Sequence, residues 1–235
     1  IIEQKREKDL ESNTRFEIKD GVAVITIPSF SRQHFVKESE QEVYKNIERY
    51  LKENEVEDII IDIRGNGGGT DEYFKMLLQI LSNRDLTFNN MFRNLFTNHN
   101  ENHSYVIKGN KNNRNYNIYL LVDNKVFSSA EAFARCLKDN NFATLIGEPT
   151  RGEGCGLTPI SIVLSNELYN GKNKKDFISL HGINMTFPIE APINERGEID
   201  YEHFYNTKPD ITCLSSEAME VALGIIKENK NINNF

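Results

Sequence analysis

The chain has 235 residues, of which 38% are hydrophobic and 27% are charged, and this composition is typical of a folded domain, not of a disordered or membrane protein. Its net charge of −7 argues against a nucleic-acid surface, because binding to phosphates needs a basic field. No run approaches the ~20 apolar residues that a membrane span requires, so we expect no membrane contact by this segment. The three cysteines are widely spaced and odd in number, which fits neither a disulfide framework nor a metal site.

The hydrophobic pattern predicts strands that alternate with helices. Residues 16–18 and 22–27 alternate apolar and polar side chains around Asp20 and Gly21, which predicts a β-hairpin. Buried strands are predicted at 56–63 and 117–122, a short strand at 143–146, a further strand at 105–107 and strand-like pieces within 158–190. Helices are predicted at 37–53, 70–81, 129–138 and 216–228. The Asn-rich remainder of residues 84–116 shows no clear pattern.

This alternation predicts an α/β fold with much parallel pairing. In such folds the residues that follow the strand ends gather along one edge of the sheet, where sites usually lie. We expect one core domain over residues 14–235, preceded by a charged helix or linker over residues 1–13 that continues from an upstream segment. Two places after predicted strands stand out, the glycine loop at 65–69 and Ser128.

Four of the five residues from Gly65 to Gly69 are glycines, and they stand between a buried strand and a helix. Glycine lets another group approach the backbone closely, and free N–H groups at a helix N-terminus attract negative charge. The loop is therefore a phosphate cradle, an oxyanion hole for acyl transfer, or a tight turn without further role. It is not a P-loop, since it lacks the Gly-Lys-Ser/Thr ending.

Ser128, Ser129, Ala130 and Glu131 also follow a strand and begin a helix. A serine at such a turn can expose its Oγ beside free N–H groups, as a nucleophile requires. The same Ser128 and Glu131 spacing is that of a capping box, which needs no catalysis. A third segment, 147–156, is a glycine-rich loop after a strand and by itself indicates only a loop.

In this order, the three segments resemble the family of C-terminal processing peptidases, tricorn and retinoid-binding protein modules. The family pattern D-L-R-x-N-x-G-G corresponds to Asp62–Gly69, S-S-A-E to Ser128–Glu131, and G-E-x-T-x-G to Gly147–Gly152. Lys208–Ile211 and the strand that ends at Phe30 also match, so the resemblance spans about residues 14–212.

The resemblance implies a crotonase-like and Clp-protease-like core, with a mostly parallel sheet flanked by helices. It implies a serine endopeptidase that cleaves extended peptides or protein C-termini by acyl transfer, without cofactor or metal. Ser128 would be the nucleophile, and the N–H groups of Gly68 and Ser129 would form the oxyanion hole. By resemblance, the protein is extracytoplasmic or membrane-anchored and faces outward.

The general base is where this chain departs from the serine–lysine branch of that family. In that branch the lysine follows the serine by 25 residues, and Glu153 stands there in this chain. An ionised glutamate is a weak base for a serine hydroxyl. We expect the histidine-dependent branch of tricorn and the nisin-resistance protein, with the base upstream of Ile1 and with Glu202 near an acidic position that orients it. The chain's own histidines lack the sequence context of such a base: His34, His99, His103, His181 and His203.

Two other functions stay open. A catalytically degenerate peptide- or ligand-binding module would keep the fold, and Glu153 would mark its lost activity. A crotonase-like acyl-CoA enzyme would have to bind coenzyme A, for which the sequence shows no basic, adenine-accepting segment. The pattern predicts no oligomeric state.

Overall fold

A computed structural model describes residues 14–19, 21–31, 40–152, 157–163, 182–188, 190–200 and 206–233. The chain divides into two compact units, one of residues 1–90, 104–153 and 205–235, the other of residues 91–103 and 154–204. We call them the sheet unit and the hairpin unit. The segment 1–13, predicted as a helix or linker, lies outside the described residues.

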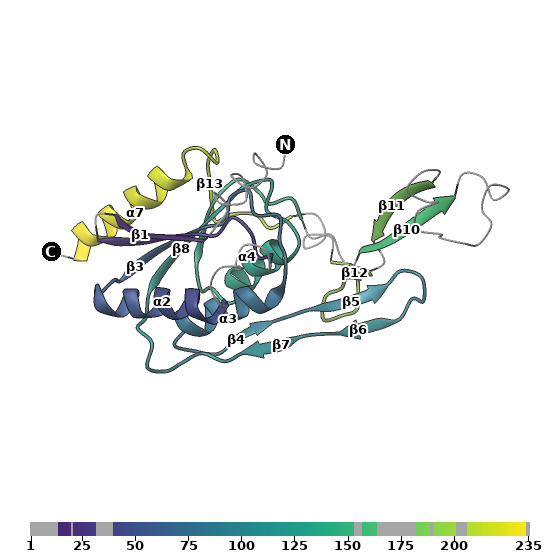
Figure 1. Ribbon diagram of the computed structural model, residues 1–235, viewed down its shortest axis with the longest axis horizontal. Coiled ribbons are helices and arrows are strands. Elements are labelled where there is room, and N and C mark those ends of the chain that lie inside the picture. The colour runs from purple at the N-terminus through teal and green to yellow at the C-terminus, as the bar shows by residue number, and fades with distance from the viewer. Residues whose placement is uncertain are drawn as a thin grey trace. The chain divides into compact units, whose positions relative to one another are not determined.

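The sheet unit is built on a six-stranded, mainly parallel sheet (Figure 1). Its strands, in spatial order, are β1 (Arg15–Lys19), β2 (Val22–Thr26), β3 (Asp58–Asp62), β8 (Asn117–Val122), β9 (Thr144–Gly147) and β13 (Ile211–Thr212). β1 and β2 form the predicted antiparallel hairpin, and every other neighbouring pair is parallel. The prediction of an α/β fold with a mostly parallel sheet is confirmed.

Helices cover both faces of this sheet (Figure 1). On one face, Ile59, Ile61 and Leu120 pack with α2 (Glu40–Glu53), α3 (Asp71–Leu81) and α4 (Ser129–Asp139). On the other face, Ile60, Tyr119 and Leu121 pack with α7 (Ala218–Asn233). Because both faces are buried, β3 and β8 need apolar side chains at nearly every position, which explains their continuous apolar runs.

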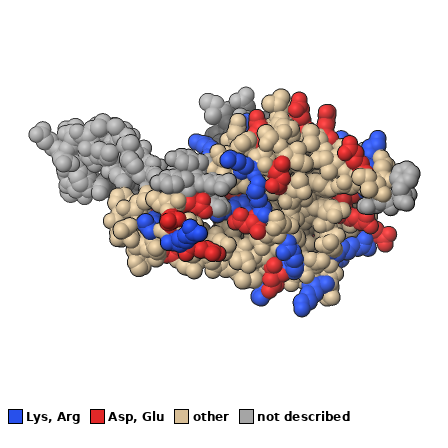
Figure 2. Space-filling model, turned by 180° about the vertical axis from the view of Figure 1, so that it is seen from behind, with Lys and Arg blue, Asp and Glu red and all other residues tan. Residues whose placement is uncertain are grey.

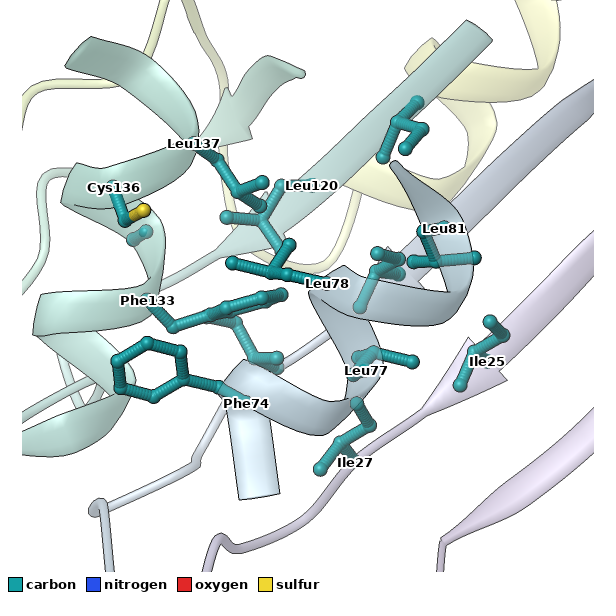
Figure 3. Close-up of a cluster of buried hydrophobic side chains, with 14 of the residues drawn as sticks. Ile25, Ile27, Phe74, Leu77, Leu78, Leu81, Leu120, Phe133, Cys136 and Leu137 are labelled. Atoms are coloured by element: carbon teal, nitrogen blue, oxygen red, sulfur yellow. The ribbon is translucent and has the colours of Figure 1, made fainter. Parts of the chain in front are cut away.

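An aromatic cluster joins α4 to α3 and to the segment of residues 22–31, which contains β2 and is called the β2 segment below. The ring centroid of Phe133 lies 5.4 Å from that of Phe30 and 5.9 Å from that of Phe74. Figure 3 shows Phe133 and Phe74 among leucine side chains of α3 and α4, with Ile25 and Ile27 of the β2 segment nearby. This packing fixes α4, and with it the turn at its N-terminus.

The Asn-rich segment contains short strands that the sequence did not reveal. β4 (Leu86–Phe88) pairs with β7 (Tyr105–Ile107), of which only β7 was predicted. In the hairpin unit, β5 (Met91–Asn94) pairs with β6 (Asn100–Asn102) and with β12 (Glu190–Pro192). Strands this short contain too few residues to establish a period of two.

The strand-like pieces predicted within 158–190 are confirmed as an antiparallel pair. β10 (Leu157–Val163) pairs with β11 (Gly182–Pro188) along all seven residues. The polar tip predicted between them lies outside the described residues.

The surface is mixed in charge, and the described helices are amphipathic or short. Figure 2 shows lysine and arginine side chains interspersed with acidic ones over the face that it draws. Within the described ranges, no helix is both long and apolar enough to cross a membrane.

Phe133→Ala should lower the free energy of unfolding by about 3–5 kcal/mol, because it removes a fully buried ring at the centre of the aromatic cluster. Denaturant unfolding of both proteins measures the difference. Phe96→Ala is the control: its ring is 71% exposed, so the change should stay within about 0.5 kcal/mol. Equal effects of the two substitutions would contradict this account of the core.

Candidate active site

The candidate residues meet where β3 and β8 end. The two strands are parallel, with Asp62 paired to Leu121, so the loops that follow them leave the sheet at the same edge. Beyond the strands, isolated parallel bridges join Phe30 to Gly69 and Phe127 to Gly152. The edge thus brings together the three segments that the sequence singled out.

Charged side chains form hydrogen bonds that hold the start of the glycine loop. The guanidinium of Arg64 donates to both carboxylate oxygens of Asp62, at 2.9 and 2.6 Å. This hydrogen bond is the main cause that raises the pKa of Arg64. The Gly65 N–H donates to Oδ1 of Asp123, 2.9 Å away, at the end of β8. Asp62 and Asp123 therefore tie the loop to both strands.

Asn66 lies at the centre of the loop and is completely buried. Its Nδ2 donates to the Ile27 carbonyl at 3.0 Å, and its Oδ1 accepts the Gly68 N–H at 2.8 Å. Its own carbonyl accepts the N–H of Phe127, the residue before Ser128, at 3.2 Å. One residue therefore links the β2 segment, the glycine loop and the turn at Ser128. The sequence pattern contained this asparagine, but nothing in it indicated these partners.

Ser128 adopts a backbone conformation that serine rarely takes. Its φ is 57° and its ψ is −129°, at the N-cap position of α4, and it is partly exposed. Such a conformation costs about 1–3 kcal/mol and persists only where the surroundings enforce it. A serine on a sharp, strained turn between a strand and a helix is also how hydrolases expose a nucleophilic Oγ.

The capping box, the alternative explanation for the Ser128 and Glu131 pair, is wrong. The Ser128 side chain makes no capping hydrogen bond, and its φ is not in the extended region that an N-cap residue uses. Glu131 is 1% exposed, and its Oε1 instead accepts the Thr207 hydroxyl at 2.6 Å. The two residues therefore have separate partners. Ser128 faces the glycine loop, while Glu131 binds Thr207, which is distant in the sequence.

The structure places Gly68 and Ser129 beside Ser128. A Cβ added at Gly68 would lie 2.7 Å from the Ser128 Cβ and 3.0 Å from the Ser129 nitrogen, so only glycine fits there. Ser129 begins α4, where the first N–H groups have no partner within the helix. The Gly68 N–H, in contrast, is bonded to Asn66 Oδ1. The oxyanion role of Gly68 and Ser129 stays a prediction.

Thr150 of the third segment completes the network around Glu131. The Thr207 N–H donates to the Thr150 Oγ1 at 2.7 Å, and the Thr150 N–H donates to the Thr207 carbonyl at 3.1 Å. Burial is the main cause that raises the pKa of Glu131, and the Thr150 and Thr207 hydroxyls lower it in part. The sequence did not single out Thr207, because nothing in its neighbourhood marks it as a partner of a residue 76 positions away.

The third segment also lies beside the turn at Ser128. The Arg151 N–H donates to the Val126 carbonyl at 2.9 Å, and the Arg151 guanidinium lies over the ring of Phe127, 5.3 Å from its centroid. Gly147 has a φ of 134°, and a Cβ there would lie 2.1 Å from the Val122 carbonyl oxygen. Glycine is thus required at position 147, because β9 packs closely on β8 there.

The structure does not establish where the acid and base candidates lie relative to Ser128. Glu153 and Glu202 lie outside the described ranges, as do His34, His181 and His203. His99 and His103 belong to the hairpin unit, where His103 Nε2 lies 3.0 Å from Oε2 of Glu101.

Within the described residues, a cluster of three or more His, Cys, Asp or Glu able to hold a metal ion is not found. Cys136 is buried in α4, and burial raises the pKa of its thiol to about 12.

A cavity of about 770 Å³ lies at the other end of the strands. Asn117 and Thr144, the first residues of β8 and β9, line it together with Lys138 and Asp210, which form an ion pair of 3.1 Å. Gly68, Ser128 and Ser129 do not line this cavity, so it is separate from the candidate site.

The family of this chain is identified by a direct sequence match, which agrees with the arrangement of the candidate site. The sequence model of peptidase family S41 matches residues 21–211. The chain belongs to peptidase family S41. The match includes the glycine loop, Ser128 and the third segment.

Several solved structures are similar in fold to this S41 chain at low sequence identity. Mature CPAF complexed with lactacystin aligns with a TM-score of 0.67 at 16% identity, over 91% of this chain and 52% of that one. A lipoprotein from Streptococcus agalactiae aligns with a TM-score of 0.61 at 19% identity, over 97% and 74%. The photosystem II D1 C-terminal processing protease aligns with a TM-score of 0.56 at 17% identity, over 86% and 48%. This chain spans about half the length of CPAF and of the D1 protease.

Ser128→Gly should raise the free energy of unfolding by about 1 kcal/mol. Glycine adopts positive φ without strain, and this gain exceeds the entropy that glycine adds to the unfolded chain. Ser128→Ala keeps the Cβ and removes no capping bond, so its stability should stay near that of the unaltered protein. Denaturant unfolding of the three proteins decides, and a destabilised Ser128→Gly variant would mean that the turn is not strained.

Glu131→Gln should change how stability depends on pH. Because burial raises the pKa of Glu131, the folded protein binds this proton more tightly than the unfolded chain does. The contribution of Glu131 to the free energy of unfolding is then complete at low pH and is lost as pH rises through the raised pKa. The stability of the unaltered protein relative to Glu131→Gln should therefore fall as the pH rises above the ordinary pKa of a glutamate, about 4.3. A constant difference in denaturant unfolding would refute the shift.

Proposed function

We propose that this chain is the catalytic core of a serine endopeptidase that cleaves extended peptides or protein C-termini by acyl transfer through Ser128. The observation that carries the proposal is the backbone of Ser128, which has a φ of 57° at a strand-to-helix turn packed against a glycine loop. A structural N-cap would not need this strain.

In the proposed reaction, Ser128 Oγ attacks the scissile carbonyl and forms an acyl-enzyme, which water then hydrolyses. The negative oxygen of the tetrahedral intermediate accepts the N–H of Ser129 and an N–H of the glycine loop, predicted at Gly68. Donors fixed before the reaction begins stabilise this charge without further reorganisation, and each is typically worth about 3 kcal/mol of barrier.

A histidine is the proposed base, in the manner of the histidine-dependent branch. The serine–lysine branch has its lysine where this chain has Glu153, which favours a different base. Glu202 is the proposed residue that orients this histidine, and Glu153 has no proposed proton-transfer role. The crotonase-like description of the core and an outward-facing location, extracytoplasmic or membrane-anchored, belong to the same proposal. The similarity to a lipoprotein supports the location.

The second candidate is a binding module that has lost catalysis. The absence of lysine at position 153 favours it. Such a module would keep the strained turn only as an inherited feature, and its serine would not react with an electrophile.

Ser128→Ala should abolish both peptide hydrolysis and labelling by a fluorophosphonate, whereas Ser129→Ala should keep most of both. Alanine at 129 retains the backbone N–H, and the Ser129 hydroxyl that it removes is buried and has no hydrogen-bond partner among the described residues. Ser129→Ala should consequently be as stable as the unaltered protein, or slightly more stable.

Mass spectrometry of the labelled peptide and turnover of an unstructured peptide library measure these effects in the intact natural protein. Labelling at Ser129, or activity that survives Ser128→Ala, would refute Ser128 as the nucleophile. A folded protein that neither reacts with the probe nor cleaves peptides would favour the binding module.

A further inference from the structure

The peptide group between Gly68 and Gly69 has a defined orientation. Its carbonyl oxygen accepts the Phe30 N–H at 3.0 Å and the Ser29 hydroxyl at 3.1 Å. The peptide is trans, so its C=O and N–H point in opposite directions. The Gly69 N–H therefore points away from Phe30, and no acceptor for it occurs within the part of the chain that the structure describes.

The side away from Phe30 is the side of Ser128. The strand order β2-β3-β8-β9 continues past the strand ends, where Phe30 pairs with Gly69 and Phe127 pairs with Gly152. Gly69 thus lies between the Phe30 segment and the Phe127 segment. The contact of Gly68 with the Ser128 Cβ shows that the loop and the turn touch at this point.

Asn66 determines this orientation. Its Oδ1 holds the Gly68 N–H toward the interior, and its Nδ2 bond to the Ile27 carbonyl fixes which end of the carboxamide faces Gly68. Glycine imposes little conformational preference of its own, so a loop with four glycines in five residues depends on such bonds for a single conformation. The Phe127 N–H bond to the Asn66 carbonyl aligns the turn at Ser128 with the same residue.

We infer that Asn66 is a positioning residue of the active site, which turns the Gly68 N–H inward and presents the Gly69 N–H to the oxyanion beside that of Ser129. The inference rests on the proposed function and moves the second oxyanion donor from Gly68 to Gly69. Gly68 is then required for its missing side chain, which lets the loop approach Ser128, and not for its N–H.

Asn66→Ala tests the positioning role, with Asn113→Ala as the matched control. Asn113 is also a buried asparagine, 7% exposed, whose Nδ2 donates to the carbonyls of Gln79 and Ser82 at 3.1 and 3.0 Å, and it lies outside the site. Asn66→Ala should lower kcat and the rate of fluorophosphonate labelling about 100-fold, the effect of losing one oxyanion donor, with KM changed less than about threefold. Asn113→Ala should lose stability but keep both rates.

The amide resonances of Gly68 and Gly69 test the donor itself in the unaltered protein, without any substitution that could prevent folding. On formation of the phosphonyl adduct at Ser128, the Gly69 amide proton should shift downfield, because it binds the adduct oxygen. The Gly68 amide proton should stay near its original position, because Asn66 retains it. A shift of Gly68 without a shift of Gly69 would overturn the assignment of Gly69.

The tests separate this inference from the proposed function. If the probe fails to label Ser128 in the unaltered protein, the proposed function fails, and the inference fails with it. If Ser128 is labelled but Asn66→Ala reacts as fast as Asn113→Ala, or loses only substrate affinity through KM, the proposed function stands and the role of Asn66 is refuted.

Discussion

The glycine loop and the turn at Ser128 touch with no room for a side chain between them, and the rest of the site is arranged around that contact. A Cβ at Gly68 would lie 2.7 Å from the Ser128 Cβ, and one at Gly69 would lie 2.0 Å from the Phe30 carbonyl carbon. Close approach on both sides of the loop requires glycine, because any larger residue would push the segments apart. The parallel pairing of β3 with β8 is what brings these two segments to the same edge.

Buried polar side chains hold the contact in place. Asn66 links the loop to the β2 segment and to Phe127, and Glu131 links α4 to Thr207 and through it to Thr150. These groups are buried, so leaving any of them without a partner would cost about 1–3 kcal/mol. The same hydrogen bonds also fix the position of the segments on either side of Ser128.

The strain at Ser128 is consistent with this arrangement. A residue with a φ of 57° persists when the elements around it leave no alternative, and here the apolar packing of α4 supplies that restraint. Phe133 anchors α4 against Phe30 and Phe74, so the start of the helix cannot relax without disturbing the core. The stability of the hydrophobic core thus maintains the strained backbone of Ser128 at the edge of the sheet.

Much of the fold could be predicted from local patterns. The hairpin of β1 and β2, the buried strands β3, β8 and β9, and helices α3 and α4 each contain enough residues to establish a hydrophobic period. The strands β4, β5 and β6 were missed, because three or four residues are too few to establish a hydrophobic period. The division into two units was also not predicted, since no change in composition accompanies the points where the chain passes between them.

The sequence by itself determined which segments form the site: their glycines, the serine and the acidic residue are present in a recognisable order. Only the tertiary structure decided what each residue does there. The spacing of Ser128 and Glu131 fits a capping box equally well, and the φ of Ser128 and the Thr207 partner of Glu131 were needed to reject it. The direction of each N–H in the glycine loop depends on bonds to Phe30 and Asn66, which local sequence does not encode, because glycine permits almost any conformation.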